Sequence, residues 1–469
     1  MTSTAHTPPI PRPAWIEVAG FKALRDPARL ELRPLTLIAG ANSAGKSSAM
    51  QPLLLMKQTL EAAYDPGPLL LDGPHVQFTQ LDQLLTRGAA PGPRALSVTF
   101  GTWSIGAGSA KQAWGPGPVR VRLVAPEQVP PPFSFDPPIV EQAIAGGWVH
   151  IREGMPVEDY LRVLYARSPM AAAMMHAEAD SLAVQTYRPG RLLAPSVVVR
   201  PRPGQEPEYG GPVFGPGIVE PLDGHEQFLR AILHLPGLRG HRERRYSVAQ
   251  VAERAGSIQA QGPFTPYAAS LLARWQDEGD ARLGWVQAAL QATGLTSTVD
   301  ARRVSAAELE LKVGRTAAST PGGAQDLVDI ADVGFGVSQV LPVIVALAAA
   351  APGQLVYVEQ PELHLHPRAQ RAMGRLLAQA ARRGVCVVAE THSRLLLRAV
   401  QTEVARGALA PDEVGLHWFS RDPESGFATV RLAELDRRGA FGDWPVDFAD
   451  VEAEADEEWL DLALAAEAR

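Results

Sequence analysis

The sequence predicts an α/β fold with a parallel sheet, and three observations lead to this expectation. An apolar run at residues 35–39 leads through a glycine-rich loop into a helical segment at residues 47–62. From Val333 onward, short apolar strands alternate with helical stretches, as in parallel strands joined by crossover helices. Polar residues stand directly after two of these strands, at the edge where open α/β sheets bind ligands.

The glycine-rich loop, residues 40–47, is a complete GxxxxGKS motif. Its glycines let backbone N–H groups face phosphate oxygens, and the following helix adds a positive dipole. Lys46 is predicted to contact the β- and γ-phosphates of ATP, and Ser47 to bind Mg²⁺. A plain Gly/Ser-rich turn is the alternative, but the strand before the loop and the helix after it favour a nucleotide site. The residues predicted to hold the nucleotide are Gly40, Asn42, Ser43, Ala44, Gly45, Lys46, Ser47 and Ser48.

The predicted strand at residues 355–358 is followed by Glu359, Gln360, Pro361 and Glu362. An acid at this end of a buried strand lies on the ligand-binding edge of the sheet, so Glu359 is predicted to hold Mg²⁺ through water. Any strand can end in an acid, and the interpretation therefore depends on the P-loop.

Two further segments open predicted helices. His392 follows a strand at residues 385–389 and is placed to donate a hydrogen bond to a γ-phosphate; alternatively, Thr391 or Ser393 is a helix cap beside a bystander histidine. Residues 334–339 contain two glycines and a serine at a helix start, which favours anion binding, with a plain turn as the alternative.

Taken together, these motifs resemble those of the ATP-binding-cassette (ABC) ATPases. More closely, the chain resembles bacterial AAA-type ATPases related to the overcoming-lysogenization-defect (OLD) proteins. The strings that carry the resemblance are residues 40–48, 332–342, 359–367 and 390–393, with lesser echoes at residues 71–73, 236–239 and 444–448. The resemblance implies a P-loop NTPase with an ABC/SMC-like head, in which a large mixed α+β insertion separates the P-loop from the signature motif.

The resemblance also implies how two copies of the chain work together. Gly336, Ser338 and Gln339 match the signature loop, which in such ATPases contacts ATP bound to the opposing subunit. His366 falls in the dimer-contacting loop, and His392 falls at the switch histidine. ATP with Mg²⁺ is thus expected between two head-to-tail heads in a dimer or larger oligomer.

Gln360 departs from the common pattern, because the residue after the Mg²⁺-side acid is usually the glutamate that orients the attacking water. An amide positions water but accepts a proton poorly, so slow hydrolysis is expected unless Glu362 substitutes. The resemblance to OLD-related ATPases implies that close relatives also carry glutamine here, and it is not interpreted as inactivation. Gln58 and Gln80 are the candidates for a Q-loop glutamine, although a polar surface residue is the simpler interpretation of each.

The predicted organisation has five parts. Residues 1–14 form a disordered lead, and residues 15–125 form the first half of the head. Residues 126–325 form the insertion, mostly helical with a Pro/Gly-rich loop, and include helical stretches at residues 155–187 and 225–313. Residues 326–449 form the second half of the head, and an acidic tail covers residues 450–469. Only 77 residues follow His392 (469 − 392), and they contain scattered acids rather than the strands of a second sheet. A Toprim nuclease domain like that of the OLD proteins is therefore not expected.

The net charge, the cysteine content and the most apolar segment limit the class of protein further. The formal net charge is −7, which disfavours a chain that coats nucleic acid over its whole surface. Cys386, the single cysteine, stands in an apolar run and is predicted to be a small buried hydrophobe. The apolar segment at residues 340–351 is shorter than the ~20 residues of a membrane-spanning helix. A cytoplasmic protein without a membrane partner is expected.

Three functions stay open on the sequence. The first is an ATP-driven switch that controls a protein effector such as a nuclease or toxin, in anti-phage defence or DNA maintenance. The second is a DNA-binding repair ATPase related to SMC-type heads, which contacts nucleic acid through a basic cluster. The third, a small-molecule phosphotransferase, is disfavoured by Ser338 and His392. A solvated basic loop is the alternative for that cluster, whose arginines are Arg239, Arg242, Arg244 and Arg245.

Overall fold

The computed structural model describes most of the 469-residue chain. The described residues are 12–87, 94–105, 112–114, 118–125, 135, 139–144, 147–151, 156, 158–159, 162–163, 182–187, 196–201, 224–239, 243–254, 257–315 and 326–442. Residues 1–11 of the lead predicted at residues 1–14, the basic residue Arg242, the Trp444 segment and the acidic tail lie outside them. The rest of that lead was wrongly predicted to be disordered, because Arg12–Pro13 form a buried strand.

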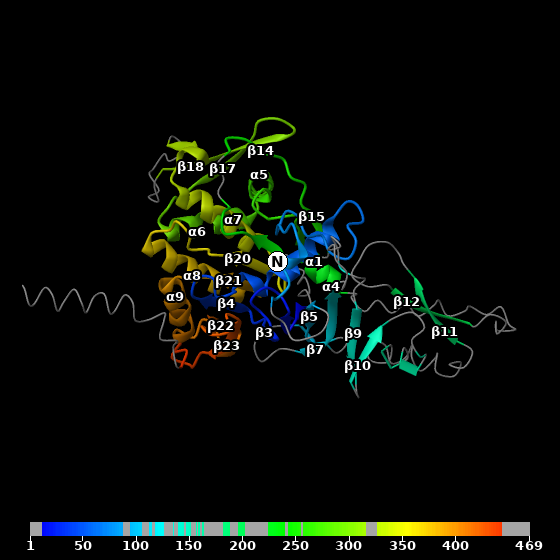
Figure 1. Ribbon diagram of the computed structural model, residues 1–469. Helices are drawn as coiled ribbons and strands as arrows, with labels where there is room; N and C mark the ends of the chain where they lie inside the picture. The colour runs from blue at the N-terminus through cyan, green and yellow to red at the C-terminus, as the bar shows by residue number, and fades with distance from the viewer. Residues whose placement is uncertain are drawn as a thin grey trace, which may run out of the picture.

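A six-stranded sheet forms the centre of the molecule (Figure 1). Its strands, in spatial order, are β13 (Leu233–Leu235), β20 (Leu355–Glu359), β21 (Cys386–Glu390), β4 (Leu35–Gly40), β22 (Val414–Arg421) and β23 (Ala428–Glu434). The strands from β13 to β22 run parallel, and β23 pairs antiparallel with β22 at the edge. The predicted α/β class with a parallel sheet is therefore confirmed.

Both faces of this sheet are covered, because its strands are apolar at almost every position. Leu37 and Val356 belong to one hydrophobic core with the helices α5 to α9, whereas Ile38 and Tyr357 belong to a second core with α1. Alternating residues of one strand thus serve opposite faces. The helices are α1 (Gln51–Glu61), α4 (His225–Ala231), α5 (Tyr267–Glu278), α6 (Ala281–Thr293), α7 (Phe335–Ala349), α8 (Pro367–Arg382) and α9 (Arg394–Ala405).

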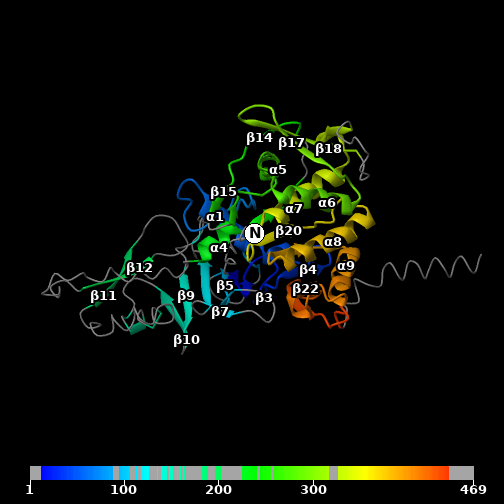
Figure 2. The ribbon, with the colours of Figure 1, turned by 180° about the vertical axis from the view of Figure 1, so that it is seen from behind.

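Figures 1 and 2 show, from opposite sides of the molecule, the layers that cover the two faces of the central sheet. Helices α6 to α9 lie beside β20, β21 and β4, while α1, α4 and a second sheet lie across from them. This second sheet is antiparallel and has the order β10 (Gly147–Ile151), β9 (Ile139–Ile144), β8 (Val119–Val124), β5 (Ala95–Phe100), β2 (Trp15–Ala19) and β3 (Ala28–Glu31).

Smaller sheets complete the described part of the chain. One contains β14 (Tyr246–Ser247), β18 (Glu308–Gly314), β17 (Val299–Arg303) and β19 (Leu327–Asp329), and α5 packs against it. The others are β1 (Arg12–Pro13) with β6 (Trp103–Ile105) and β7 (Gln112–Trp114), β11 (Leu182–Tyr187) with β12 (Ser196–Pro201), and β15 (Ala252–Arg254) with β16 (Ser257–Gln259).

Two expectations about the middle of the chain need correction. The region predicted to be helical up to residue 187 ends in strand β11. In residues 225–313 the strand-like segment predicted at residues 308–313 is confirmed as β18, but the stretch also contains the strands β13 to β17, which were not predicted. More importantly, β13 lies within the predicted insertion and yet forms an edge of the central sheet. β13 is only three residues long, Leu-His-Leu, and a hydrophobic pattern of that length cannot distinguish a strand from a helix.

Other local predictions are confirmed. Cys386 is a buried hydrophobe in β21. The helix after the P-loop is present, but it starts with a 3-10 turn at Ser47–Ala49 before α1. Within the described residues, we found no helix with the length and apolarity needed to cross a bilayer.

Candidate nucleotide site

The predicted motifs meet at the carboxyl end of the central sheet. The P-loop follows β4, Glu359 ends β20, and Glu390 ends β21. Glu359 and Glu390 are register partners on neighbouring strands, and Glu390 pairs in turn with Ile38 of β4. One edge of the sheet therefore carries a phosphate-binding loop and two acids, which is where open α/β sheets bind ligands.

The P-loop backbone makes a tight turn. Ser43 and Gly45 have φ angles of +61° and +96°, in the left-handed region. The Lys46 Nζ donates to the carbonyl oxygens of Gly40 at 3.0 Å and Ala41 at 2.7 Å. Burial lowers the pKa of Lys46, and two neighbouring carboxylates partly offset this effect. The lysine is thus held against the backbone of its own loop.

The loop also retains backbone donors for a phosphate. The Ala44 N–H donates to the Ala41 carbonyl at 3.3 Å. The amides of Ser43, Gly45 and Lys46 make no backbone hydrogen bond within the described part of the chain. Amides at the start of a helix need an acceptor, and phosphate oxygens provide one. The loop therefore fits a nucleoside triphosphate.

Glu390 is a site residue that the sequence analysis missed. Its Oε2 accepts a 2.8 Å hydrogen bond from the Ser47 hydroxyl, and its Oε1 accepts one from the Tyr357 hydroxyl. Burial and the neighbouring charge of Glu359 raise the pKa of Glu390 to about 7. The signal that could have found it is the one used for Glu359, an acid at the end of a buried strand.

Glu359 is fixed at both oxygens. Its Oε1 lies 3.2 Å from His234 Nε2, and its Oε2 accepts the Gly237 N–H at 3.1 Å. Burial alone raises the pKa of Glu359, but the His234 hydrogen bond and charge, with the Gly237 N–H and Arg239, bring it below its usual value. The two acids Glu359 and Glu390 lie beside the hydroxyl of Ser47, the last residue of the P-loop. Together they offer the oxygen ligands that Mg²⁺ prefers.

Glu362 lies on the same side of the sheet and contacts the backbone of His392. Its Oε1 accepts the His392 N–H at 2.7 Å, while its Oε2 has no hydrogen-bond partner of normal geometry among the described residues. Burial raises the pKa of Glu362. Burial and the charge of Lys46 lower the pKa of His392, so that ring is neutral near pH 7. Glu362 is therefore a buried carboxyl group whose Oε2 has no hydrogen-bond partner within the described part of the chain and is enclosed by the protein.

Gln360, at the position of the usual catalytic glutamate, adopts a φ of +42°. Its N–H donates to the Glu390 carbonyl at 2.8 Å, and its own carbonyl accepts from Arg239 and from the Leu363 N–H. Positive φ is uncommon for a residue other than glycine, and here three main-chain bonds stabilise it. The backbone of Gln360 is thus fixed just after Glu359 at the end of β20.

Arg239 requires a correction, because it is not part of an exposed basic cluster. Its side chain is 3% exposed, and its guanidinium donates to main-chain carbonyls that include those of Glu359 at 2.7 Å, Gln360 at 3.1 Å and Gln339 at 3.0 Å. Burial lowers its pKa to about 10, which still leaves it charged at neutral pH. Arg239 therefore joins the start of α7 to the end of β20. Arg244 and Arg245 are exposed and pair with Asp332 and Glu308.

The signature segment lies at the start of α7. Ser338 and Gln339 are buried and bonded within the chain: the Ser338 hydroxyl donates to the Phe335 carbonyl, and Gln339 Oε1 accepts the Arg239 N–H. Phe335 is half exposed and packs on the ring of His364. A contact of Gly336, Ser338 and Gln339 with ATP on a second subunit stays a prediction.

The candidate glutamines and histidines have local roles in the described structure. Gln58 is not a surface residue: it is buried in α1, and its amide brackets the loop at residues 70–76 by bonds to Leu70 and Val76. Gln80 is exposed. His366 caps α8 by accepting the Arg368 N–H. Among the described residues, no cluster of three or more His, Cys, Asp or Glu is arranged to hold a metal ion.

The fold and the site define the chain as a P-loop nucleotide-binding protein of the α/β class. Residues 230–398 match the family described as "AAA domain, putative AbiEii toxin, Type IV TA system". That stretch contains β13, β20 and β21 with their polar ends but begins after the P-loop. No curated protein matched the chain.

Solved structures similar to the chain include three SMC heads, each at 10% identity. The Smc head bound to the C-winged helix domain of ScpA has a TM-score of 0.44, with 91% of this chain and 98% of that chain covered. The SMC head domain from Thermotoga maritima has a TM-score of 0.38, with coverage of 90% and 100%. The Smc head with an extended coiled coil, bound to a ScpA domain derived from Pyrococcus furiosus, also has a TM-score of 0.38, with coverage of 90% and 96%.

Proposed function

We propose that this protein is a slow Mg²⁺-dependent ATPase that works as a switch, oligomerising with ATP between heads and controlling a partner effector. The observation that carries the proposal is the bond between Ser47 of the P-loop and Glu390 of β21. It brings the phosphate-binding loop against an edge that also carries Glu359 and Glu362, so binding groups and a candidate base share one site.

Each side chain has a role in this proposal. Lys46 and the free loop amides bind the phosphates, and Ser47 with Glu359 and Glu390 holds Mg²⁺. When bound there, Mg²⁺ would supply positive charge opposite the negative charge that develops on the transferred phosphoryl group. Glu362 accepts the proton of the attacking water at Oε2, its oxygen without a hydrogen-bond partner in the described structure, since a raised pKa brings a carboxylate nearer to neutral pH. His392 donates a hydrogen bond to the γ-phosphate.

Gln360 accounts for the slow turnover. Its amide orients water without accepting a proton, so Glu362 acts as the base from two residues further along the chain. A long-lived ATP-bound state suits a switch better than a rapid enzyme does, because the bound nucleotide then sets how long two heads stay together. We further propose that residues 334–339 of one copy complete the site of another.

The effector and the setting are proposed on similarity. The motifs resemble those of OLD-related ATPases, and the family matched by residues 230–398 is described as a putative toxin of a type IV toxin–antitoxin system. Both support a role in bacterial anti-phage defence, with a nuclease or toxin as the partner. The DNA-repair alternative is weakened, because Arg239 is buried and Arg244 and Arg245 are paired.

Sedimentation of the purified protein tests the switch. With ATP and Mg²⁺, the Glu362→Gln variant is expected to keep a dimer or larger species for longer than the wild type does, and Lys46→Ala is expected to stay in the nucleotide-free state. A sedimentation coefficient of Glu362→Gln that does not respond to ATP, although ATP binds, rules out the ATP-sandwiched assembly. Turnover stimulated by duplex DNA would instead favour the repair function.

A further inference from the structure

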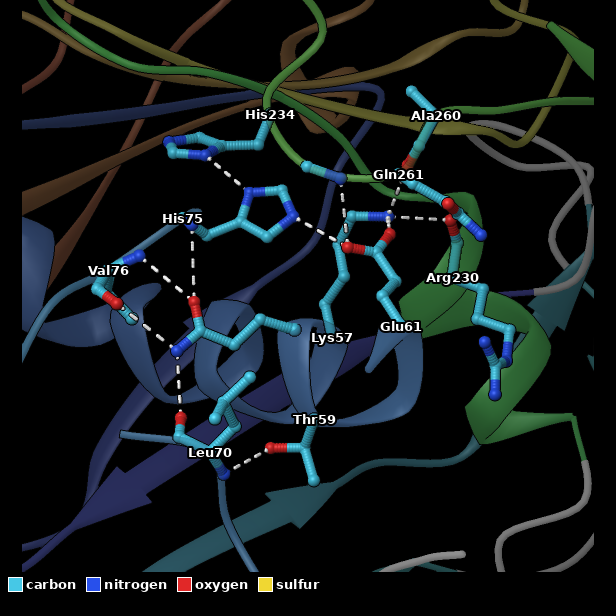
Figure 3. Close-up of polar contacts among 12 residues, drawn as sticks. Lys57, Thr59, Glu61, Leu70, His75, Val76, Arg230, His234, Ala260 and Gln261 are labelled. Carbon is cyan, nitrogen blue, oxygen red and sulfur yellow. Dashed lines mark hydrogen bonds and ion pairs between the residues drawn. The ribbon is translucent and has the colours of Figure 1, made fainter. Parts of the chain in front are cut away.

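A chain of buried polar contacts connects Glu359 with helix α1. We name it the histidine chain: Glu359, His234, His75, Glu61 and Lys57. His234 Nε2 lies 3.2 Å from Glu359 Oε1, and His234 Nδ1 lies 3.0 Å from His75 Nδ1. His75 Nε2 then lies 3.1 Å from Glu61 Oε2, and Glu61 Oε1 lies 2.6 Å from Lys57 Nζ. Figure 3 shows His75 between His234 and the two α1 side chains.

The far end of the histidine chain is anchored to the backbone. Lys57 Nζ also donates to the carbonyl of Arg230 at 2.8 Å and of Ala260 at 3.1 Å, and Glu61 accepts the Gly262 N–H at 3.0 Å (Figure 3). These contacts fix the end of α1 that is farther from the P-loop. The histidine chain thus begins on the helix that follows Ser47 and ends on the carboxylate of Glu359.

The rings have little freedom to reorient. His234 is 1% exposed and stacks on Tyr357 with centroids 5.4 Å apart, and His75 is 9% exposed. Burial lowers the pKa of His75 to about 4, so His75 is neutral near pH 7. Because water does not reach these groups readily, an imidazole nitrogen without its protein partner would remain unsatisfied. The single ring proton of a neutral His75 serves the Glu61 carboxylate from Nε2, so its Nδ1 accepts from His234, and that bond fixes the orientation of the His234 ring.

We propose that His234, and His75 through it, are positioning residues that hold the Glu359 carboxylate in the orientation required for Mg²⁺. This inference rests on the proposed function, in which Glu359 contributes to Mg²⁺ binding. The Gly237 N–H holds Oε2 of this carboxylate, and His234 holds Oε1. Residues that orient a metal ligand in this way typically contribute about 10- to 100-fold to metal affinity.

Replacing a histidine by glutamine in one variant and by asparagine in another distinguishes its role as a hydrogen-bond partner from its role in packing. A glutamine amide nitrogen reaches about as far as Nε2 of histidine, and an asparagine amide about as far as Nδ1. His234→Gln therefore keeps a donor for Glu359, whereas His234→Asn removes it. The measurement is binding of a fluorescent ATP analogue during a Mg²⁺ titration, with a second series in EDTA.

We expect His234→Asn to raise the Mg²⁺ concentration at half-maximal binding by about tenfold. His234→Gln should stay closer to the wild type, and nucleotide affinity in EDTA should change in neither variant. Equal Mg²⁺ requirements for His234→Asn and the wild type would overturn the proposal. Equal losses in both variants, or the same loss in EDTA, would also overturn it, because either result indicates a packing role alone.

The His75 pair repeats the test one contact further from Glu359, and it serves if the His234 variants fail to fold. His75→Asn keeps the atom that meets His234, whereas His75→Gln keeps the atom that meets Glu61. The larger Mg²⁺ requirement is expected for His75→Gln, and the reverse order contradicts the inference. If the wild type binds the nucleotide with Mg²⁺ but these variants match it, the inference alone fails. If the wild type binds no nucleotide, the proposed function fails too.

Discussion

Ser47 and Glu390 are 343 residues apart in the sequence, and their side chains share a hydrogen bond of 2.8 Å. The bond connects the P-loop to the strand that separates it from Glu359, because β21 lies between β4 and β20. Glu390 is almost completely buried and faces Glu359 on the next strand. This geometry leads to the first prediction.

Glu390→Gln should make the protein relatively more stable as the pH rises. In the folded chain the pKa of Glu390 is raised from 4.5 to about 7, so the folded state keeps a proton that the unfolded state loses. Wild-type stability therefore falls between pH 4.5 and pH 7, by about 3 kcal/mol from this group. Glutamine does not titrate, so urea unfolding without Mg²⁺ or nucleotide should show the gain in Glu390→Gln over the wild type increasing across that window.

The surface variant Glu424→Gln is a suitable control for the pH series, since Glu424 is exposed. Its difference from the wild type should stay small across the same range. A Glu390→Gln gain that does not change with pH would contradict the raised pKa. Mg²⁺ binding should also weaken in the wild type below pH 7, where Glu390 holds its proton.

Glu362→Gln should slow ATP hydrolysis while leaving ATP bound. Loss of a general base typically lowers kcat by about 100- to 10,000-fold. The substitution keeps the acceptor for the His392 N–H, so nucleotide affinity should change little. Single-turnover phosphate release compares it with Gln360→Ala, which should be much less impaired. If Gln360→Ala is the slower of the two, Glu362 is not the base.

Arg239→Met should lower the free energy of unfolding without changing how tightly the protein binds DNA. The substitution leaves several buried main-chain carbonyls without their donor, among them those of Glu359 and Gln339. Each unsatisfied group costs about 1–3 kcal/mol, so we expect a loss of about 3 kcal/mol in the free energy of unfolding. Arg245→Met, at an exposed ion pair, should lose less than about 1 kcal/mol. Unchanged stability of Arg239→Met in urea would show that these contacts carry no net weight.

Lys46→Ala should weaken ATP binding without unfolding the protein. A hydrogen bond to a charged group contributes about 1.5–3 kcal/mol, which corresponds to about a 10- to 100-fold rise in Kd. Calorimetric titration with ATP measures this change, and Lys312→Ala on β18, in a separate sheet, is the matched control. Equal affinities of Lys46→Ala and the wild type would show that phosphates are held elsewhere.

Several elements of the fold could be read directly from the sequence. The strands predicted at residues 35–39, 355–358 and 385–389 agree within one residue at each end with Leu35–Gly40, Leu355–Glu359 and Cys386–Glu390. Each is a continuous apolar run, which is typical of a parallel strand buried on both faces. The P-loop was equally clear, because glycines and a lysine at fixed spacing encode a backbone shape.

The interpretation of Arg239 could not come from the sequence. Next to other arginines it indicated a solvated basic loop, whereas in the fold its guanidinium is enclosed by main-chain carbonyls of β20 and α7. Those carbonyls lie 100 residues or more away along the chain. Burial and hydrogen-bond partners depend on which segments meet, and local composition does not report that.

The sequence by itself thus determined a phosphate-binding loop, a parallel α/β sheet and the acid at the end of β20. Only the tertiary structure brought Glu390 to Ser47 and placed His234 on an edge strand beside Glu359. It also linked His234 and Glu359 to α1 through His75. The reason is physical: local patterns fix periodicity and backbone conformation, while the pairing order of β13, β20, β21 and β4 decides which side chains become neighbours.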